Sequence, residues 1–305
     1  MSSSRTRTHL VERAAEALGG LSALGAAGAG LAGPLPVPVL PPAPVLRETA
    51  GGEAAPPRAS ITAETLARAG LVSLEPGRSR LSEELSVIAH QVVGPVLTPG
   101  KGERTPRLVL VTSARPGEGK SFTALNIAAR ITVTSGHPVV LVDADGKRHS
   151  LSDLLGCSAE PGLRMLAADP TRHPAPLLVP TASERLSILP YGGATREHSG
   201  VLSGTAVAAA VQALAAALPR HIIILDAPPC LSTSEASMLA PAVGQVLMVV
   251  EAERTQGSEL EAALDMVDAC PMLRLVLNRT NFTPSNTFGA YGYGAYGTSH
   301  HDAPT

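Results

Sequence analysis

Residues 107–121, RLVLVTSARPGEGKS, decide how this chain folds. They begin with an apolar run at 107–113, which predicts a β-strand. The loop at 114–121 follows, and the pattern beyond it predicts a helix over 119–134. The loop fits the phosphate-binding pattern G-x-x-x-x-G-K-[ST], with Ala114 in place of the first glycine. A strand, a glycine-rich loop and a helix in this order predict an α/β unit that cradles phosphate groups.

The residues of this loop have the chemistry that phosphate binding needs. Gly117 and Gly119 allow backbone N–H groups to turn inward around phosphate oxygens, and the helix that follows adds its positive N-terminal end. Lys120 is expected to reach the terminal phosphates, and the Ser121 hydroxyl to bind Mg²⁺. We therefore expect nucleotide contacts from the whole loop: Arg115, Pro116, Gly117, Glu118, Gly119, Lys120, Ser121 and Phe122.

Further apolar runs recur along the chain, each bounded by turn residues and separated by helical stretches. They lack alternation and are rich in Val, Ile and Leu, which is typical of strands buried on both faces of a parallel sheet. The runs are 138–144, 186–190, 221–229, 245–251 and 273–278, and the helical stretches are 205–218, 231–240 and 257–269. This pattern predicts an α/β, doubly wound fold with a mostly parallel sheet and with ligands beyond the carboxyl ends of its strands.

Three carboxylates stand where two of the predicted strands end. Asp143 and Asp145 follow the run VVLV, and Asp226 follows the run IIIL. Carboxylates at strand ends that face a phosphate loop hold Mg²⁺ and the attacking nucleophile. The alternative is that these acids cap the following helices, and it stays open above all for Asp145.

The composition excludes several classes of protein. Hydrophobic residues make up 44% and charged residues 16% of the 305 residues, which excludes a wholly disordered chain. The formal net charge of −2 gives no support for broad electrostatic binding to nucleic acid or to an anionic membrane. Three cysteines lie far apart, which argues against a disulfide framework or a zinc site and favours a reducing cytosol.

Composition and periodicity divide the chain into five segments. Ahead of the α/β core, helices are predicted near 62–70 and over 79–93, and acids in the first turn of the second suit a helix N-terminus. The predicted segments are a short N-terminal helix at 1–18, an Ala/Pro/Gly-rich disordered linker at 19–59, a helical pre-core segment at 60–104, the nucleotide-binding core at 105–279, and a flexible Gly/Tyr-rich tail at 280–305.

Two apolar stretches resemble membrane spans at first sight. Residues 19–46 hold six prolines and six glycines, which a helix exposed to lipid does not tolerate. Residues 201–218 approach the length of a span, but a span there would separate motifs that are expected to form one site. We therefore expect 201–218 to form a buried helix of the core.

The ordered motifs TSARPGEGKS, LVDADGKR and ILDAPP resemble those of the bacterial protein-tyrosine kinases, or BY-kinases, within the deviant-Walker P-loop ATPases. The flanks LVERAAEAL, RLSEELSVI and TSEASMLAPAVGQVLMVVEAERT are most similar to the exopolysaccharide- and exosortase-associated tyrosine autokinases. The resemblance covers about residues 60–280. The motif triplet is specific for the superfamily, and the flanks point to the kinase branch.

This resemblance implies an ATP- and Mg²⁺-dependent tyrosine autokinase that regulates exopolysaccharide biosynthesis or export. Lys120 and Ser121 would bind ATP phosphates and Mg²⁺, Asp143 would activate the tyrosine hydroxyl, and Asp145 with Asp226 would complete the metal shell. Asn278 matches a position that contacts adenine. The resemblance also implies a homo-oligomer, activated by a membrane-spanning polysaccharide co-polymerase or chain-length determinant. This partner would hold the cytoplasmic protein at the inner face of the plasma membrane.

Three departures from the family pattern bear on two alternative functions: Arg115 weighs against a partitioning ATPase, whereas residues 86–91 and 146–149 leave a weakly active adaptor open. Arg115 stands where partitioning ATPases have a signature lysine, and residues 86–91 lack the basic residues that promote ring assembly. Residues 146–149, GKRH, replace a common Arg-Pro stretch, and Gly146 predicts a looser turn there. The alternatives are a partitioning or positioning ATPase, and a nucleotide-binding adaptor of a polysaccharide export complex with weak kinase activity.

The C-terminal tail contains an unusual cluster of tyrosines. Residues 289–297 read GAYGYGAYG, so that Tyr291, Tyr293 and Tyr296 stand among glycines. Because glycines lose much conformational freedom on ordering, we expect a flexible segment that presents its phenol groups freely. In the context of the resemblance these tyrosines are predicted phosphoacceptors, although a Gly/Tyr-rich segment without modification is an alternative.

Overall fold

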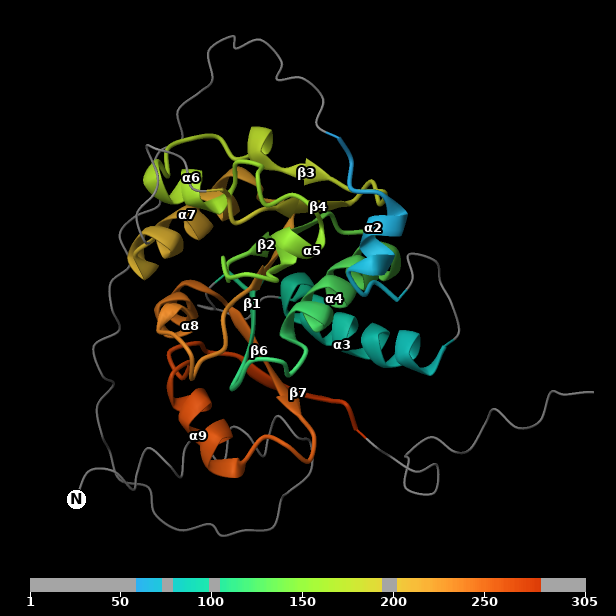
Figure 1. Ribbon diagram of the computed structural model, residues 1–305, viewed down its shortest axis with the longest axis vertical. Helices are drawn as coiled ribbons and strands as arrows, with labels where there is room; N and C mark the ends of the chain where they lie inside the picture. The colour runs from blue at the N-terminus through green and yellow to red at the C-terminus, as the bar shows by residue number, and fades with distance from the viewer. Residues whose placement is uncertain (1–58, 73–78, 99–104, 194–201, 281–305) are drawn as a thin grey trace, which may run out of the picture.

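The computed structural model describes residues 59–72, 79–98, 105–193 and 202–280 (Figure 1). The predicted N-terminal helix, nearly all of the linker, and the tail beyond residue 280 lie outside the described residues. Within them, seven strands form one sheet in the order β3-β4-β2-β5-β1-β6-β7, which runs from top to bottom in Figure 1. Neighbouring strands are parallel except for β3, which is antiparallel to β4. The predicted α/β fold is thereby confirmed.

Six of the seven strands in the described residues coincide closely with the apolar runs of the sequence, whereas the two-residue strand β3 was not predicted. Their bounds are β1 Leu108–Ser113, β2 Val139–Asp143, β3 Val179–Pro180, β4 Leu186–Leu189, β5 Ile222–Asp226, β6 Gln245–Glu251 and β7 Leu273–Asn278. Every residue of β1, β2, β5 and β6 is buried, as the absence of alternation predicted. The edge strand β7 is only partly buried.

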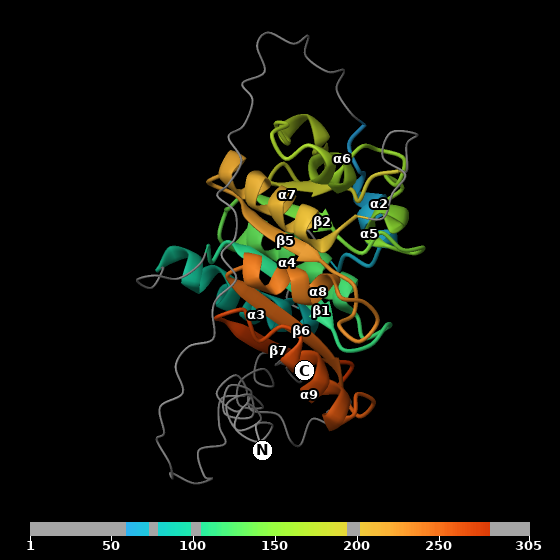
Figure 2. The same cartoon turned by 90° about the vertical axis from the view of Figure 1, so that its left-hand side faces the viewer.

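Helices cover both faces of the sheet. The bounds are α2 Ala63–Arg68, α3 Arg80–Leu97, α4 Lys120–Thr134, α5 Leu151–Leu154, α6 Leu163–Ala168, α7 Gly204–Ala217, α8 Glu235–Leu239 and α9 Gly257–Asp265, with 3₁₀ turns at Ala175–Leu177 and Ala240–Ala242. Helices α2 to α5 lie on one face, and α6 to α9 on the other (Figures 1 and 2).

Side chains of each strand alternate between the two layers of core. In β1, Leu108 and Leu110 pack with α6 to α9, whereas Val109 and Val111 pack with α2 to α5. Helix α7, which contains most of the apolar stretch 201–218, contributes Val211 and Leu214 to the first layer. Along the described stretches, no helix combines the length and the apolar character needed to cross a membrane.

The bounds of several elements differ from those predicted. Helix α8 begins at Glu235 rather than residue 231, and α9 ends at Asp265 rather than residue 269, while α3 and β5 differ for local reasons. Helix α3 continues to Leu97 rather than ending at Val93. Pro95 in its last turn lacks the N–H that would donate to the carbonyl of residue 91, but the Thr98 N–H still donates to the Gly94 carbonyl at 3.1 Å. Strand β5 ends at Asp226 instead of residue 229. The N–H groups of Cys230 and Leu231 donate to the carbonyls of Ser113 and Ala114, so the chain runs beside the phosphate loop before α8 begins.

Backbone hydrogen bonds attach residues 59–72 of the pre-core segment to the core at two places. Ile61 pairs with the edge of the sheet, since its N–H donates to the carbonyl of Pro180 at 2.9 Å. On α4, the Asn126 side chain accepts from the Val72 N–H at 2.8 Å and donates to the Gly70 carbonyl at 3.0 Å. These bonds place the pre-core segment directly behind the helix that follows the phosphate loop.

Candidate active site

The carboxyl ends of three central strands bring the predicted site residues together. Strands β2 and β5 pair in a register that sets Asp143 beside Asp226, and β1 pairs with β5 so that Val111 lies beside Asp226. The phosphate loop leaves β1 at this same edge and leads into α4. Residues that are about 30 and 100 positions apart in the sequence thus share one site.

The conformation of the phosphate loop depends on its glycines. Gly117 and Gly119 have φ values of 89° and 95°, in the left-handed region that favours glycine. Gly119 is also the N-cap of α4, and no side chain caps this helix. The first N–H groups of α4 therefore remain available for an anion, next to the positive end of the helix dipole.

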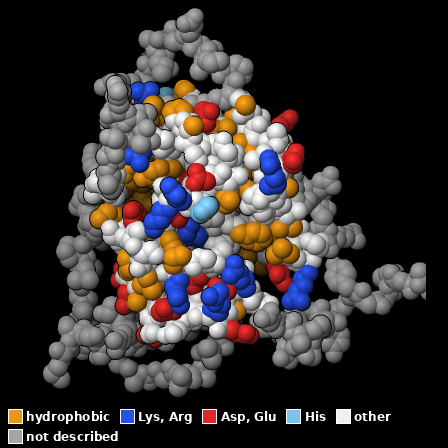
Figure 3. All heavy atoms as spheres, viewed as in Figure 1, with side chains coloured by type: hydrophobic (Ala, Val, Ile, Leu, Met, Phe, Trp, Pro, Cys, Tyr) orange, Lys and Arg blue, Asp and Glu red, His pale blue; other side chains and the backbone are white. Residues whose placement is uncertain are grey.

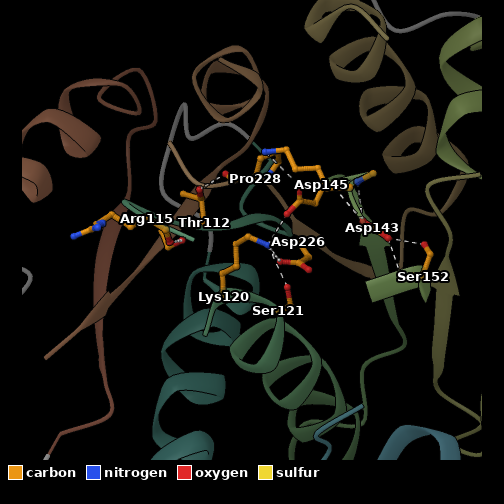
Figure 4. A network of polar contacts seen from close by, with 12 residues as sticks. Thr112, Arg115, Lys120, Ser121, Asp143, Asp145, Ser152, Asp226 and Pro228 are labelled. Carbon is orange, nitrogen blue, oxygen red and sulfur yellow. Dashed lines mark hydrogen bonds and ion pairs between the residues drawn. The ribbon is translucent and has the colours of Figure 1, made fainter. Parts of the chain in front are cut away.

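Lys120 lies among the strand-end carboxylates (Figure 4). Its Nζ is 2.7 Å from Asp145 Oδ2, 3.7 Å from Asp226 Oδ1 and 3.2 Å from Ser121 Oγ. Burial lowers the pKa of the Lys120 ammonium, but Asp226 and Asp145 raise it by more, so that the net pKa lies above its ordinary value. Lys120 therefore carries a firm positive charge at the mouth of the loop.

Asp226 is a fully enclosed carboxylate at the end of β5. Its side chain is fully buried, and neither carboxylate oxygen has a hydrogen-bond partner. Burial raises its pKa to about 7, and the nearby Lys120 opposes this shift. A carboxylate left without hydrogen bonds is a strong candidate for a cation ligand, because an isolated buried charge is costly.

The residues present fit Mg²⁺ bound together with a nucleotide. Asp226 and Asp145 both have carboxylate oxygens without a hydrogen-bond partner, and Ser121 offers a hydroxyl beside Lys120. Among the described residues, no group of three or more His, Cys, Asp or Glu side chains is arranged to hold a metal alone. Mg²⁺ in nucleotide sites takes one or two carboxylates and completes its shell with phosphate oxygens and water, which suits this donor set.

Asp143 occupies a different environment from Asp145 and Asp226. Its side chain is fully buried, and both of its oxygens accept hydrogen bonds. Oδ1 accepts from the N–H of Asp145 at 3.1 Å, and Oδ2 accepts from the Ser152 N–H at 2.8 Å and from Ser152 Oγ at 2.5 Å. These contacts hold the turn after β2 in place. The predicted role of Asp143 as a base remains a prediction.

The far side of the phosphate loop is held by residues from β6 and β7. Glu118 is buried; it accepts from the Arg115 N–H at 2.8 Å and from the Thr255 hydroxyl. The Asn278 amide donates to the Glu118 carbonyl at 2.9 Å and lies against Gly119. The structure thus places Asn278 at the backbone of the loop.

The side chains of three other residues predicted to contact the nucleotide lie against other parts of the chain or at the surface of the protein. The Arg115 side chain points away from Lys120 in Figure 4, and its guanidinium lies 3.4 Å from Glu259 on α9, with 53% of the side chain exposed. The Phe122 ring contacts Gly70 at the end of the pre-core helix. Pro116 is exposed.

Sequence reasoning missed three residues that hold the site together. Thr255 binds Glu118, Ser152 binds Asp143, and Tyr191 lies against Gly146. For Thr255 and Ser152 no local pattern could reveal the contact. Tyr191 had a usable signal, because it follows a predicted strand at the carboxyl edge of the sheet. Its contact with Gly146 also means that the turn predicted to be looser is covered by an aromatic ring.

Comparisons with known proteins agree with this geometry. A sequence model described as "ParA: NUBPL iron-transfer P-loop NTPase" matches residues 104–288, more than half of the chain. The chain is 32% identical over 190 residues to EpsB, a candidate tyrosine-protein kinase of Ralstonia nicotianae, in a match covering 62% of this chain and 24% of EpsB. It is 28% identical over 193 residues to the succinoglycan biosynthesis transport protein ExoP of Rhizobium meliloti, covering 61% of this chain and 23% of ExoP.

The chain thus spans about a quarter of the length of these curated relatives. The kinase domain of the Escherichia coli tyrosine kinase ETK superposes with a TM-score of 0.51 at 19% identity, over 70% of this chain and 80% of that domain, which shows a shared fold. These relatives confirm the resemblance to bacterial tyrosine kinases drawn from the sequence. With the matched family model and the phosphate loop in its strand–loop–helix setting, the chain belongs to the ParA family of P-loop NTPases.

Proposed function

We propose that this chain is an ATP- and Mg²⁺-dependent protein-tyrosine autokinase that regulates exopolysaccharide production. The observation that carries the proposal is the cluster of Lys120, Asp145 and Asp226 at the N-terminus of α4, in which carboxylate oxygens lack hydrogen-bond donors. Such a site binds the phosphates of a nucleotide with its metal. The tyrosine-kinase and polysaccharide names of the relatives support the choice of reaction.

Each residue of the site has a proposed role in phosphoryl transfer. Lys120 binds the terminal phosphates, for which it leaves the carboxylates that surround it in this structure, and the loop N–H groups hold the remaining phosphate oxygens. Ser121, Asp145 and Asp226 hold Mg²⁺, which neutralises charge that develops on the transferred phosphoryl group when it is bound.

The assignment of the base that receives the tyrosine proton rests on the resemblance rather than on a contact in this structure. The resemblance assigns it to Asp143, whose oxygens are fully engaged with Ser152 and with the turn. Hydrogen bonds in a ligand-free site often rearrange in the reacting complex, so we retain Asp143 in this role. A neighbouring chain that delivers a tyrosine would have to open the turn around Ser152.

The position of Arg115 weighs against the partitioning-ATPase alternative. In that class the residue at this position acts on phosphate, whereas Arg115 is turned toward Glu259 on the surface of α9. The adaptor alternative keeps the same nucleotide site and lacks efficient transfer. Of the partners, we propose a membrane-spanning polysaccharide co-polymerase as activator, which would hold homo-oligomers of this protein at the inner face of the plasma membrane.

The test is to incubate the purified protein with Mg-ATP and to map phosphotyrosine by mass spectrometry, with Lys120→Met as the matched control. We expect phosphate on Tyr291, Tyr293 or Tyr296, and none in the variant. Circular dichroism establishes that the variant is folded. Hydrolysis of ATP without phosphotyrosine would favour the ATPase, and nucleotide binding without either reaction would favour the adaptor.

A further inference from the structure

Tyr191 is the one tyrosine of this chain outside the 289–297 cluster, and it stands two residues after β4, at the same edge of the sheet as the site. Its ring occupies the space beside Gly146. A Cβ atom added to Gly146 would lie 2.4 to 2.6 Å from three carbons at the hydroxyl end of the ring. Gly146 has a φ of 60°, so the backbone there also disfavours other residues. The ring and the bare glycine therefore fit each other.

Tyr191 is itself fixed by its surroundings. Its N–H donates to Ser152 Oγ at 3.0 Å, and its carbonyl accepts from the Arg164 N–H at 2.9 Å. The Arg164 guanidinium lies over the ring, 5.2 Å from its centroid, as in a cation–π contact. Burial raises the pKa of the half-buried phenol, so that it adds no negative charge beside the carboxylates. The ring is thus a neutral and well-anchored surface.

The turn under this ring delivers a carboxylate to the phosphate loop. Asp145, which precedes Gly146, binds Lys120 at 2.7 Å, and its position depends on the path of the turn. At the base of the turn, Asp143 accepts from the N–H groups of Asp145 and Gly146, at 3.1 and 3.4 Å. Ser152 connects Asp143 to the backbone of Tyr191. Tyr191 thus contacts the turn at Gly146 with its ring, and with its backbone N–H it contacts Ser152, which holds the base of the turn.

We propose that Tyr191 is a positioning residue that holds the Asp143–Lys147 turn closed and thereby sets the Asp145 carboxylate for the metal–nucleotide complex. The inference rests on the proposed nucleotide site and deepens it. It accounts for a pairing that the family resemblance left unexplained, a glycine at 146 together with an aromatic ring at 191. Larger residues at 146 require a smaller residue at 191.

The first test uses the ligand-free protein, with Tyr191→Ala to remove the ring and Tyr191→Phe to keep it. Both variants retain the backbone N–H that binds Ser152. In Tyr191→Ala we expect amide hydrogen exchange of Asp145 and Gly146 to be about tenfold faster, with exchange at Gly119 and Lys120 unchanged. Tyr191→Phe should behave as wild type. Turn exchange within about twofold of wild type in a folded Tyr191→Ala protein would overturn the proposal.

The second test separates positioning of Asp145 from general stability. Titration with a fluorescent ADP analogue gives the affinity with Mg²⁺ and with EDTA. In the presence of Mg²⁺ we expect Tyr191→Ala to bind the ADP analogue about five- to tenfold more weakly than wild type. In EDTA we expect its affinity to stay within about twofold of the wild-type value. Equal losses under both conditions would mean a merely structural role. If Tyr191→Ala does not fold, Tyr191→Leu, which retains bulk but not the flat ring, replaces it in both tests.

The third test is a double-mutant cycle with Gly146→Ala. Alone, this substitution drives a methyl group into the ring, and we expect an Mg²⁺-dependent loss similar to that of Tyr191→Ala. In the Tyr191→Ala background we expect Gly146→Ala to cause a loss of Mg²⁺-dependent affinity that is at least about threefold smaller than in wild type. The reason is that the steric conflict is gone and only the backbone strain remains. Additive losses would contradict the contact. Since nucleotide affinity is the readout, a wild-type protein that binds Mg-nucleotide but forms no phosphotyrosine refutes the kinase proposal alone.

Discussion

At the scale of a single residue, the burial of Asp226 explains why the site should bind a cation. The side chain is fully buried at the end of β5, without hydrogen-bond donors, and burial raises its pKa to about 7. The unfolded chain exposes the same carboxyl group to water, where its pKa is about 4. The ionised form of Asp226 therefore lowers the free energy of unfolding of the ligand-free protein, and a bound cation removes this penalty.

The first prediction concerns Asp226→Asn and pH. The penalty from Asp226 is absent below about pH 4, grows as pH rises from there to about 7, and is complete above it, because the folded state retains a proton that the unfolded chain loses. We expect the variant to melt at a higher temperature than wild type at pH 8, by on the order of 5 °C, and this gain to shrink as the pH falls and to vanish toward about pH 4. Calorimetry of the ligand-free proteins measures it.

Asp265→Asn, at an exposed carboxylate of α9, is the control and should show no such trend. A gain that stays constant between pH 5 and 8 would mean that Asp226 does not titrate with folding. On addition of Mg-ADP the order should reverse, because only the wild-type carboxylate stabilises the complex.

The second prediction concerns Glu118, whose side chain holds the phosphate loop from within. Glu118→Ala removes the acceptor for the Arg115 N–H and for the Thr255 hydroxyl, and we expect nucleotide affinity to fall about tenfold. Thr255→Val removes one of the two bonds with little change in shape and should lose less. In the double variant, measured by the same titration, we expect the loss of binding free energy to be smaller than the sum of the two single losses.

Arg115→Ala serves as the control for Glu118, since Glu118 binds the backbone of Arg115 and not its side chain. Its guanidinium forms a half-exposed ion pair with Glu259, and such pairs contribute little. We expect nucleotide affinity within about twofold of wild type. A large loss in Arg115→Ala would instead place the guanidinium at the phosphates, as partitioning ATPases have it.

At the scale of elements, helix α4 connects the phosphate loop with the pre-core segment. The helix begins at Lys120, and nearly two turns later Asn126 uses both ends of its amide to bind the backbone of Gly70 and Val72. On the neighbouring α3, Ser82 accepts from the buried Arg130 guanidinium at 2.5 Å. The segment that precedes the core is therefore attached to the element that carries the nucleotide site.

The third prediction is that Asn126→Ala detaches residues 59–72 while the core stays folded. The variant leaves the Val72 N–H and the Gly70 carbonyl without their partner, at a cost of roughly 1–3 kcal/mol. Amide exchange at Val72 and Leu71 should accelerate far more than exchange in β1 and β5. Thr134→Ala, whose hydroxyl binds only its own helix, should leave exchange unchanged. Equal acceleration in the strands would show global rather than local unfolding.

At the scale of the whole molecule, charge gives little guidance to partners. Acidic and basic side chains are interspersed over the face shown in Figure 3, in line with the formal net charge of −2. The predicted phosphoacceptors lie beyond the described residues, thirteen residues and more after Asn278. Thirteen extended residues reach roughly 40 Å, which is enough to approach a neighbouring subunit.

The fourth prediction is that tail phosphorylation occurs between subunits and loosens the assembly. Three phosphotyrosines add roughly five negative charges within six residues, close to a neighbour's acidic site. Lys120→Met protein with an intact tail is mixed with active protein whose Tyr291, Tyr293 and Tyr296 are Phe. We expect mass spectrometry to find phosphate on the inactive partner and light scattering to show a smaller assembly. An unmodified tail beside an active kinase would refute transfer between subunits.

The amino-acid sequence by itself determined the class of fold and the position of the site. Runs such as VVLVD and IIILD are typical of strands buried on both faces of a parallel sheet, and Gly117 and Gly119 permit the backbone that the phosphate loop requires. Both signals are local. They depend on side-chain type and backbone freedom over a few residues, so they can be read without tertiary contacts.

Only the tertiary structure decided which side chains hold that site in shape. Thr255 meets Glu118 across 137 positions of sequence, and Tyr191 meets Gly146 across a stretch that contains two helices, a 3₁₀ turn and two strands. The structure also showed that Asp143 is bound on both oxygens while Asp226 is bound on neither. Three aspartates that look alike in sequence differ in their hydrogen bonds, because the donors to Asp143 come from its own turn and from Ser152 on α5, and none of them reaches Asp226.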